Sequence, residues 1–494
     1  MRLADEFTQN MDSKITLPVV IPFIQQLLQS QQYVLRSTGH LLLSAIIEGS
    51  REQLQEKAQQ DLLLQMATQS IQGDPSNRVV HSAIQTLGSL CRDLNLDEDN
   101  IEIETVDQSQ NAEKTKSFFS SIYAQEIMQS IIIAIKGVDI DVGGGQKVRR
   151  NPCFPVQLMA CRMTTTFSDN VSKSILKENC QILVQVIFEL LYQNQQYITE
   201  MANSESEKNN ELQRIQQQLL TSSTSQLDED IINTKFTNKL KAAYKIRVQS
   251  AIALTTLFDT IEEGCEQYFS VVCPIVMSGL IGEGMSRIVD IGSQIACVAS
   301  QQDKEYQSAC IDCVMALFSG IGKEKAGQYL NQFMGEIIKI EKEMNFDPIK
   351  SQLQLNQQQQ QQSQDQTSSL QHKIYKDESD PRIRSIESLY VRLADLVKEQ
   401  FVPLLEFAMK PLLRTAQKRS GIRVLFSEQS LSDNLRGNSS GKLGDDSIIF
   451  IDENNKEVYI EGDNAENDRT NALKAISQIA VSLGKNLGQN YSQQ

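Results

Sequence analysis

The sequence predicts an all-α fold, an α-solenoid of the ARM/HEAT type with roughly seven helix pairs. The first observation is the stretch 74–93, whose apolar or small side chains follow the i, i+3, i+4, i+7 spacing of a helix with one buried face. The second is the stretch 33–49, which carries the same pattern and begins at residue 33 rather than 77, a shift of 44 residues. A two-helix unit with a period of about 40–47 residues is typical of HEAT repeats.

Local signals define the unit further. Asp74 and Ser76 can accept hydrogen bonds from the free N–H groups of the helix that follows them, and Pro75 suits its first turn. An apolar helix pattern over 17–29 precedes 33–49, and another over 52–72 precedes 77–93. Each unit is therefore expected to be a long helix, a tight turn and a second helix with small residues on its inner face.

Helical periodicity continues through most of the remaining chain. It predicts helices over 114–137, 153–169, 171–194, 239–263, 265–280, 283–300, 302–320, 323–344, 379–400, 401–417 and 470–487. Pro274 is expected to kink or split its helix, and 138–152 is expected to be a loop. Two short apolar runs, Ile448–Ile451 and Glu457–Ile460, allow a small hairpin.

Composition divides the chain into repeat segments and insertions. We expect HEAT repeats over 1–199, 236–350 and 378–426, with a final helix and tail over 469–494. Residues 200–235 form a polar insertion, either flexible or a solvated helix, because few core-forming side chains occur there. A Gln-rich disordered loop is predicted over 351–377 and an acidic insertion over 427–468, while 97–107 forms an acidic linker.

The charge balance excludes some classes of partner. A net charge of −15 and a pI of about 4.9 disfavour direct nucleic-acid binding, which needs a basic surface. They are compatible with basic protein partners, although the same charge also keeps a large protein in solution. No apolar run reaches the ~18–20 residues of a membrane span, so we expect no membrane insertion. The nine cysteines are scattered on helical patterns and indicate free, buried thiols in a reducing compartment.

The usual signatures of catalysis and of metal or cofactor binding are missing from the sequence. The three histidines, His40, His81 and His372, share no spacing with Cys or Asp that would form a metal or nucleophile site. Cys310 and Cys313 lie on one helix face without a second Cys pair, which favours core packing over zinc or redox chemistry. The glycines 143–145 before Lys147 lack the full spacing of a phosphate-binding loop. We therefore expect no enzyme activity, no cofactor and no metal.

Several segments, in order, resemble the karyopherin-β (importin-β) family of nuclear transport receptors, most closely the importin beta-3 type. They are YVLRSTGHLLLSAIIEGS (33–50), DPSNRVVHSAIQTLGSLCRD (74–93), TTTFSDN (164–170), LFDTIEEGCEQYF (257–269), GIGKEKAGQYLNQFMGEIIKI (320–340) and FVPLLEFAMKPLLRTAQ (401–417). The resemblance runs from about residue 17 to residue 488. Receptors of this type are about twice as long, so it also implies that N- and C-terminal repeats, including the main Ran-GTP contacts, lie outside this chain.

The resemblance implies a binding protein of the cytoplasm, the nucleus and the nuclear pore. In the family, second helices line a concave face that holds basic nuclear localisation signals, outer grooves bind Phe-Gly nucleoporins, and Ran-GTP releases the cargo. Carboxylates near the ends of second helices are then the expected cargo contacts: Glu48, Asp93, Asp169, Asp259, Glu262 and Glu263. The alternative is a HEAT-repeat structural scaffold for a multiprotein complex, which would bind a non-basic partner regardless of Ran-GTP.

Overall fold

A computed structural model describes most of the chain in two compact units, Met1–Arg382 and Ile383–Gln494. The described residues are 13–50, 54, 57–93, 121–141, 147–171, 173–203, 205–221, 229–281, 293–344, 380–417, 422–426, 448–451, 457–462 and 465–484. Each unit is described by itself. The acidic linker 97–107, the Gln-rich loop 351–377, the glycines 143–145 and His372 lie outside these ranges.

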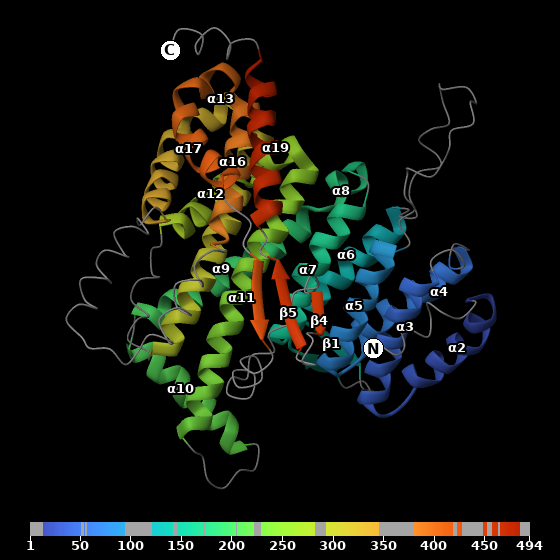
Figure 1. The fold of residues 1–494 in the computed structure, drawn as a ribbon. Coiled ribbons are helices and arrows are strands. Elements are labelled where there is room, and N and C mark those ends of the chain that lie inside the picture. The colour runs from blue at the N-terminus through green and yellow to red at the C-terminus, as the bar shows by residue number, and fades with distance from the viewer. Residues whose placement is uncertain are drawn as a thin grey trace, which may run out of the picture. The chain divides into compact units, whose positions relative to one another are not determined.

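The first unit is an array of helix pairs (Figure 1). The first helices of the pairs are α2 (Ser13–Leu28), α4 (Lys57–Gly73), α6 (Ser121–Lys136), α8 (Lys173–Asn179) with α9 (Gln181–Asn203), and α12 (Glu266–Ile281). The second helices are α3 (Tyr33–Gly49), α5 (Asn77–Asp93), α7 (Phe154–Asn170), α11 (Glu229–Ile261) and the first part of α13 (Ser293–Met344). The backbone of α13 breaks at Gly322, with φ of 79°, so α13 consists of two helical segments.

Contacts between helices confirm the predicted all-α solenoid. Helix α3 packs on α5, α5 on α7, α7 on α11 and α11 on α13, which gives one continuous layer of second helices. Helix α4 packs on α6, and α6 on α9, in a layer of first helices. Each helix pair therefore buries its apolar face mainly against the helix pairs before and after it in the chain, as in other repeat proteins.

The α3–α5 contact shows the register of the repeat. The hydroxyls of Ser37 and Ser82 lie 2.8 Å apart, and those of Ser44 and Ser89 lie 2.7 Å apart. Both pairs are buried and both join residues 45 positions apart, so α3 and α5 run in the same direction. The 44-residue shift between the two sequence patterns thus corresponds to one step of the array.

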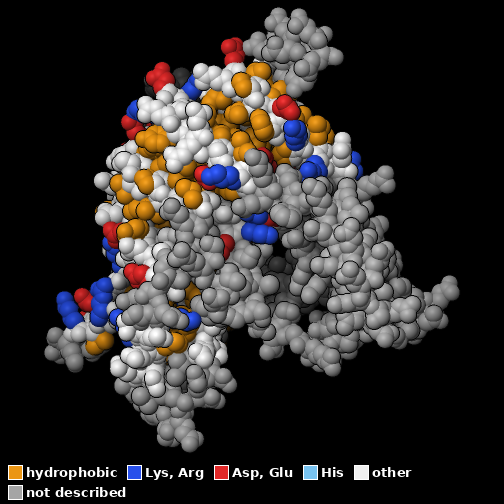
Figure 2. Space-filling view, turned by 90° about the vertical axis from the view of Figure 1, so that its left-hand side faces the viewer, with side chains coloured by type: hydrophobic (Ala, Val, Ile, Leu, Met, Phe, Trp, Pro, Cys, Tyr) orange, Lys and Arg blue, Asp and Glu red, His pale blue; other side chains and the backbone are white. Residues whose placement is uncertain are grey.

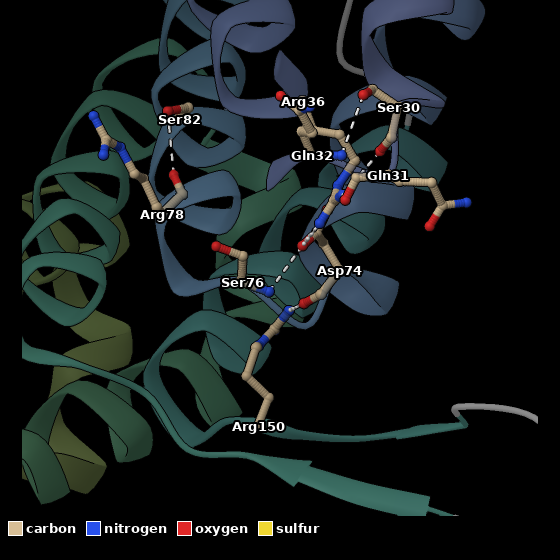
Figure 3. A network of polar contacts seen from close by, with 9 residues as sticks. All are labelled: Ser30, Gln31, Gln32, Arg36, Asp74, Ser76, Arg78, Ser82 and Arg150. Carbon is tan, nitrogen blue, oxygen red and sulfur yellow. Dashed lines mark hydrogen bonds and ion pairs between the residues drawn. The ribbon is translucent and has the colours of Figure 1, made fainter. Parts of the chain in front are cut away.

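The predicted turn at Asp74 forms, and it also connects three successive helix pairs (Figure 3). The carboxylate of Asp74 accepts the N–H of Ser76 at 2.8 Å and two bonds from the guanidinium of Arg36, at 2.5 and 3.0 Å. Arg36 also donates to the carbonyls of Ser30 and Gln31 in the preceding turn. From the following unit, Arg150 donates to the Asp74 carbonyl at 2.7 Å. This network lies where the second helices begin.

Residues 138–152 do not form the plain loop that the sequence predicts. Strands β1 (Val138–Asp141) and β2 (Lys147–Arg150) pair antiparallel, with Val138 opposite Arg150. Gly137 has a φ of 79°, and a side chain there would collide with the Arg150 carbonyl, so the hairpin base requires glycine. The hairpin brings the Arg150 side chain onto the carbonyls that end α4.

The polar insertion 200–235 takes the helical alternative. Helix α10 (Glu205–Thr221) and the beginning of α11 pack on the end of α9 around a small apolar cluster that includes Met201, Ile215 and Phe236. Glu211 is buried and pairs with Lys239 of α11 and with Arg214. The described part of this segment is therefore helical because a few of its apolar side chains pack against α9 and α11, although its overall composition is polar.

Some helix boundaries differ from the prediction. Helix α13 continues from Ser293 through Gln301 and Gln302 to the break at Gly322, so the predicted boundary between 300 and 302 is wrong, because glutamine is a good helix former. Pro274 lies inside α12, which continues to Ile281 without being split. Proline in mid-helix removes one backbone hydrogen bond, and the packing of α12 on α13 compensates for that loss.

A buried arginine joins three helices in the middle of the first unit. Arg247 of α11 has no exposed side-chain surface. Its guanidinium lies over the rings of Tyr306 and Tyr244, with distances of 3.9 and 4.8 Å from its central carbon to the two ring centroids. It donates to Gln195 Oε1 of α9 at 2.9 Å and to Asp303 Oδ1 of α13 at 3.0 Å.

The second unit contains helices and a small sheet. Its helical elements are α16 (Arg382–Val397), the 3₁₀-helix η5 (Lys398–Leu404), α17 (Leu405–Ala416) and α19 (Ala465–Leu483). Strands β4 (Ile448–Ile451) and β5 (Glu457–Gly462) form the predicted hairpin, and β3 (Ile422–Phe426), which was not predicted, pairs with the other edge of β5. Helices α17 and α19 pack together as the last pair.

One stretch of the described chain, Asn233–Ile281, is long and apolar enough to span a membrane by length and composition alone. The sequence-based expectation overlooked it. The stretch comprises most of α11 and all of α12, separated by the 3₁₀-helix η3 (Glu262–Cys265), and α11 packs on α7, α9 and α13. Core helices of helical arrays have this composition, so the stretch is weak evidence for a span.

The α3–α5 contact predicts a pH dependence of stability. His40 is fully buried, neither ring nitrogen has a hydrogen-bond partner among the described residues, and burial lowers its pKa to about 4. In the unfolded chain His40 binds a proton near pH 6.5, whereas in the folded chain it does so only near pH 4. The free energy of unfolding is therefore unaffected by His40 above pH 6.5 and decreases as the pH falls toward 4, by up to about 3 kcal/mol. The hydrogen-exchange protection factors of α3 and α5, which are corrected for the intrinsic pH dependence of amide exchange, should decrease over this range.

The variant His40→Leu is the control for this prediction. It keeps an apolar side chain of similar volume and cannot take up a proton, so the acid sensitivity of α3 and α5 should decrease. Equal acid sensitivity in the variant would show that other groups, and not His40, cause it.

Candidate functional site

Four of the six predicted carboxylates lie at or near the ends of consecutive second helices. They are Glu48 on α3, Asp93 on α5, Asp169 on α7 and Asp259 on α11. Because these helices stack in chain order, their ends follow one another along one edge of the layer. The carbonyl end of a helix carries a partial negative charge, which adds to that of the side chains. We call these four residues the acidic edge.

The first two members of the acidic edge share a basic neighbour. Glu48 is exposed, and Asp93 is half-buried in the last turn of its helix. The guanidinium of Arg92 pairs with Asp93 at 3.2 Å. Both carboxylates raise the pKa of Arg92, the hydrogen bond to Asp93 more than the charge of Glu48. This end of the edge therefore carries less negative charge than its carboxylates alone would give.

The other two members lie further along the layer. Asp169 is exposed, and partial burial of its carboxyl raises its pKa. Asp259 is exposed in the last turn of α11. Both side chains are accessible to a partner that lies across the ends of α7 and α11.

Glu262 and Glu263 lie beyond the helix end, in η3. Glu262 has a φ of 51°, and its carboxylate accepts from Lys173 Nζ at 2.6 Å and from Lys177 Nζ at 3.3 Å, both on α8. These hydrogen bonds lower its pKa. The carboxylate of Glu262 is thus paired with two lysines of the same chain, whereas Glu263 beside it is exposed. Glu262 and Glu263 therefore lie outside the acidic edge.

The structure also shows a cavity that sequence reasoning missed. It has a volume of about 180 Å³ and is lined by residues of α3, α5 and α7. Glu48, Arg92 and Arg162 contribute charge to its wall, and Met159 and Met163 contribute apolar surface. The sequence contains a usable signal, because Gly88 interrupts the apolar face of α5 and the two methionines are spaced i, i+4 on α7.

An aromatic cluster joins α12 to both parts of α13. The ring of Phe269 lies 4.9 Å from that of Tyr329 and 6.3 Å from that of Phe318. Tyr329 is 41% exposed and Val271 is 54% exposed. Figure 2 shows hydrophobic side chains reaching the surface between charged ones on the face that it draws. This cluster is a candidate for the outer apolar surface that the sequence resemblance implies.

The thiols of Cys310 and Cys313 do not form a reactive pair. Cys310 and Cys313 are fully buried in α13, and burial raises the pKa of both. Buried thiols with raised pKa values are poor nucleophiles. Within the described ranges, His, Cys, Asp and Glu side chains form no group of three that could hold a metal ion.

Comparison with solved structures identifies proteins of similar fold. No protein-family model matches the sequence. The karyopherin Kap121p bound to the SUMO protease Ulp1p matches with a TM-score of 0.56 and 14% identity, over 97% of this chain and 32% of that chain. Kap121p bound to Pho4p matches with a TM-score of 0.57 and 14% identity, over 97% of this chain and 32% of that chain. Kap121p alone matches with a TM-score of 0.56 and 15% identity, over 98% of this chain and 32% of that chain.

These matches show that the chain has the all-α solenoid fold of a karyopherin. It spans about a third of the length of the structures that it matches. At 14–15% identity the similarity concerns the fold, and function has to be argued from the site.

Proposed function

We propose that this chain is part of a nuclear transport receptor of the karyopherin-β family, and that its acidic edge binds basic nuclear localisation signals. The observation that carries the proposal is the row of carboxylates at the ends of consecutive helices, on a fold shared with Kap121p structures that contain bound proteins. An extended Lys/Arg-rich segment can pair with several carboxylates of such a row in turn. Complementary charge would also accelerate its association.

The partners that follow from this proposal are cargo proteins, Phe-Gly nucleoporins and Ran-GTP, in the cytoplasm, the nucleus and the pore. The aromatic cluster around Phe269 and Tyr329 supports nucleoporin binding, because partly exposed rings beside an apolar surface suit a phenylalanine side chain. Release of cargo by Ran-GTP requires repeats that move against one another, and arrays with contacts mainly between neighbours allow this. The proposed function needs no catalysis.

The test is a charge reversal at the two accessible members of the acidic edge. Asp169→Lys combined with Asp259→Lys should weaken binding of a fluorescein-labelled Lys-rich localisation peptide by at least about tenfold, equivalent to about 1.4 kcal/mol. Fluorescence anisotropy at several salt concentrations measures this, and wild-type binding should weaken steeply with salt, because exposed charges are screened.

A matched control changes the same charge elsewhere. Asp61→Lys combined with Glu324→Lys replaces exposed carboxylates on α4 and α13 and alters the net charge equally. It should bind the peptide almost as wild type does. Equal weakening by both double variants would mean that only net charge matters, and unchanged binding by the Asp169/Asp259 variant would remove the acidic edge as the cargo site.

A further inference from the structure

Three contacts fix which residues of helices α3, α5, α7 and α11 lie level with one another. The buried serine pairs offset α3 and α5 by 45 residues. The Nδ2 of Asn77 in α5 donates to the carbonyl of Asn151, 74 residues later and just before α7. The sulfur of Cys161 in α7 lies 3.6 Å from the hydroxyl oxygen of Ser250 in α11, 89 residues later. Residues separated by these offsets therefore lie at the same height in the layer.

This register brings cations of three helices together. From Arg78, in the first turn of α5, steps of 74 and 89 residues lead past the start of α7 to Lys241 of α11. Lys245 follows Lys241 by one turn on the same face. Burial, and then the charge of Arg162 on α7, lower the pKa of His81, one turn after Arg78, so Arg162 acts on this part of α5. We call Arg78, Arg162, Lys241 and Lys245 the cationic row.

The side chains of the cationic row are available to a partner. Arg78, Arg162 and Lys245 are exposed, and Lys241 is half-buried. None of the four forms an ion pair with any residue that the structure describes. Figure 3 shows the guanidinium of Arg78 pointing away from Asp74, whose carboxylate is bound by Arg36. The positive charge of the row is therefore not neutralised by side chains beside it.

The acidic edge is too distant to neutralise the two ends of the row. Arg78 and Asp93 lie at opposite ends of α5, about 22 Å apart along the helix axis. Lys245 and Asp259 lie about 21 Å apart along α11. Both separations exceed the Debye length of ~8 Å at physiological ionic strength. The row therefore keeps a local positive potential, although the chain carries a net charge of −15.

We propose that the cationic row binds an acidic segment of a partner protein, extended across α5, α7 and α11. Packed helices lie about 8–10 Å apart, so the row spans about 20 Å between α5 and α11, which about six residues of extended chain can cross. A short acidic peptide contacts only this row, whereas a long nucleic acid would also meet the repulsion of the acidic chain. The inference goes beyond the proposed function, because it does not involve the acidic edge.

The test uses the intact chain and a fluorescein-labelled peptide with the core Asp-Glu-Asp-Glu-Asp-Glu, followed by fluorescence anisotropy. Wild type should bind this peptide, and the affinity should fall steeply with added salt, because exposed charges are screened. Lys241→Glu combined with Lys245→Glu should weaken binding by at least about tenfold. Arg78→Glu alone should weaken it by about threefold or more, because the site extends from α11 to α5.

A matched control makes the same charge change outside the row. Lys323→Glu combined with Lys474→Glu replaces exposed lysines on α13 and α19, and it should bind the acidic peptide nearly as wild type does. Equal weakening by the two double variants, or full affinity in Arg78→Glu, would overturn the row as the site. If the Glu variant of α11 melts earlier than wild type, Lys241→Gln combined with Lys245→Gln removes the charges alone and should still weaken binding.

Two further measurements decide the class of partner and separate this inference from the proposed function. A labelled single-stranded oligonucleotide that binds more tightly than the acidic peptide would overturn the choice of an acidic protein segment. Asp169→Lys combined with Asp259→Lys should not weaken the acidic peptide. If wild type binds the Lys-rich localisation peptide and not the acidic one, the cationic row is wrong and the acidic edge stands. The opposite result would leave the row and remove the proposed function.

Discussion

Replacing Arg247 with alanine is expected to destabilise the middle of the first unit by about 3–5 kcal/mol, the usual cost of removing one partner of a buried ion pair. The variant removes the donors to Gln195 and Asp303 and leaves a void between two tyrosine rings. Burial already raises the pKa of Asp303 to about 6 despite Arg247, so the unpaired carboxyl would take up a proton more readily.

Hydrogen exchange followed by mass spectrometry gives the required spatial resolution. Peptides from α9, α11 and α13 should exchange faster in Arg247→Ala, whereas those from α3 and α5 should change little, because repeats interact mainly with their neighbours. The global thermal transition should also shift to lower temperature.

Two further variants separate the ion pair from the packing. Arg384→Ala removes a guanidinium that is 64% exposed and pairs with Asp468, so it should cost less than about 1 kcal/mol. The double variant Arg247→Met/Asp303→Asn fills the space between the rings without leaving an unpaired charge, and should recover much of the loss. If Arg247→Ala were as stable as wild type, the stabilising role of Arg247 would be wrong.

Replacing Gly320 with alanine is expected to destabilise the chain by about 1–3 kcal/mol, because a methyl group there has no room. An added Cβ would lie 2.5 Å from the carbonyl oxygen of Glu262 and closer still to the sulfur of Cys265. A backbone carbonyl cannot rotate away as a flexible side chain can, so α13 would have to move away from η3.

A glycine on the same helix provides the control. An added Cβ at Gly327 meets nothing within 4 Å, so Gly327→Ala should stabilise the helix by up to about 1 kcal/mol, the difference in helix propensity. Thermal unfolding of the two variants side by side measures the contrast. Similar melting temperatures would show that η3 and α13 are not packed as closely as described.

Strong local signals made some elements predictable. Helices α3 and α5 begin and end where the sequence predicts, because amphipathic periodicity and turn residues coincide at Asp74–Ser76. The helix predicted over 153–169 is also observed, as α7, because its periodicity is helical although Thr and Phe side chains in it favour strands.

Long-range contacts account for most of what could not be predicted. The hairpin β1–β2 is too short to show a clear alternation, and its Arg150 bonds to residues 76 and 79 positions earlier. The acidic edge was predictable because it depends only on where helices end. The lysine pairing of Glu262 was not, since Lys173 and Lys177 precede it by 89 and 85 residues. Arg162 gave no signal because its surroundings come from three helices.

The two edges of the second-helix layer in the first unit differ in mechanical character. Where the helices begin, Asp74 bonds to Arg36 and Arg150 and so connects three successive helix pairs. Where they end, the acidic edge presents like charges that repel one another. Curvature should therefore change by opening or closing the acidic edge about the edge that Asp74 connects. A bound cationic partner would offset the repulsion between these carboxylates, and it would hold the array at one curvature until it dissociates.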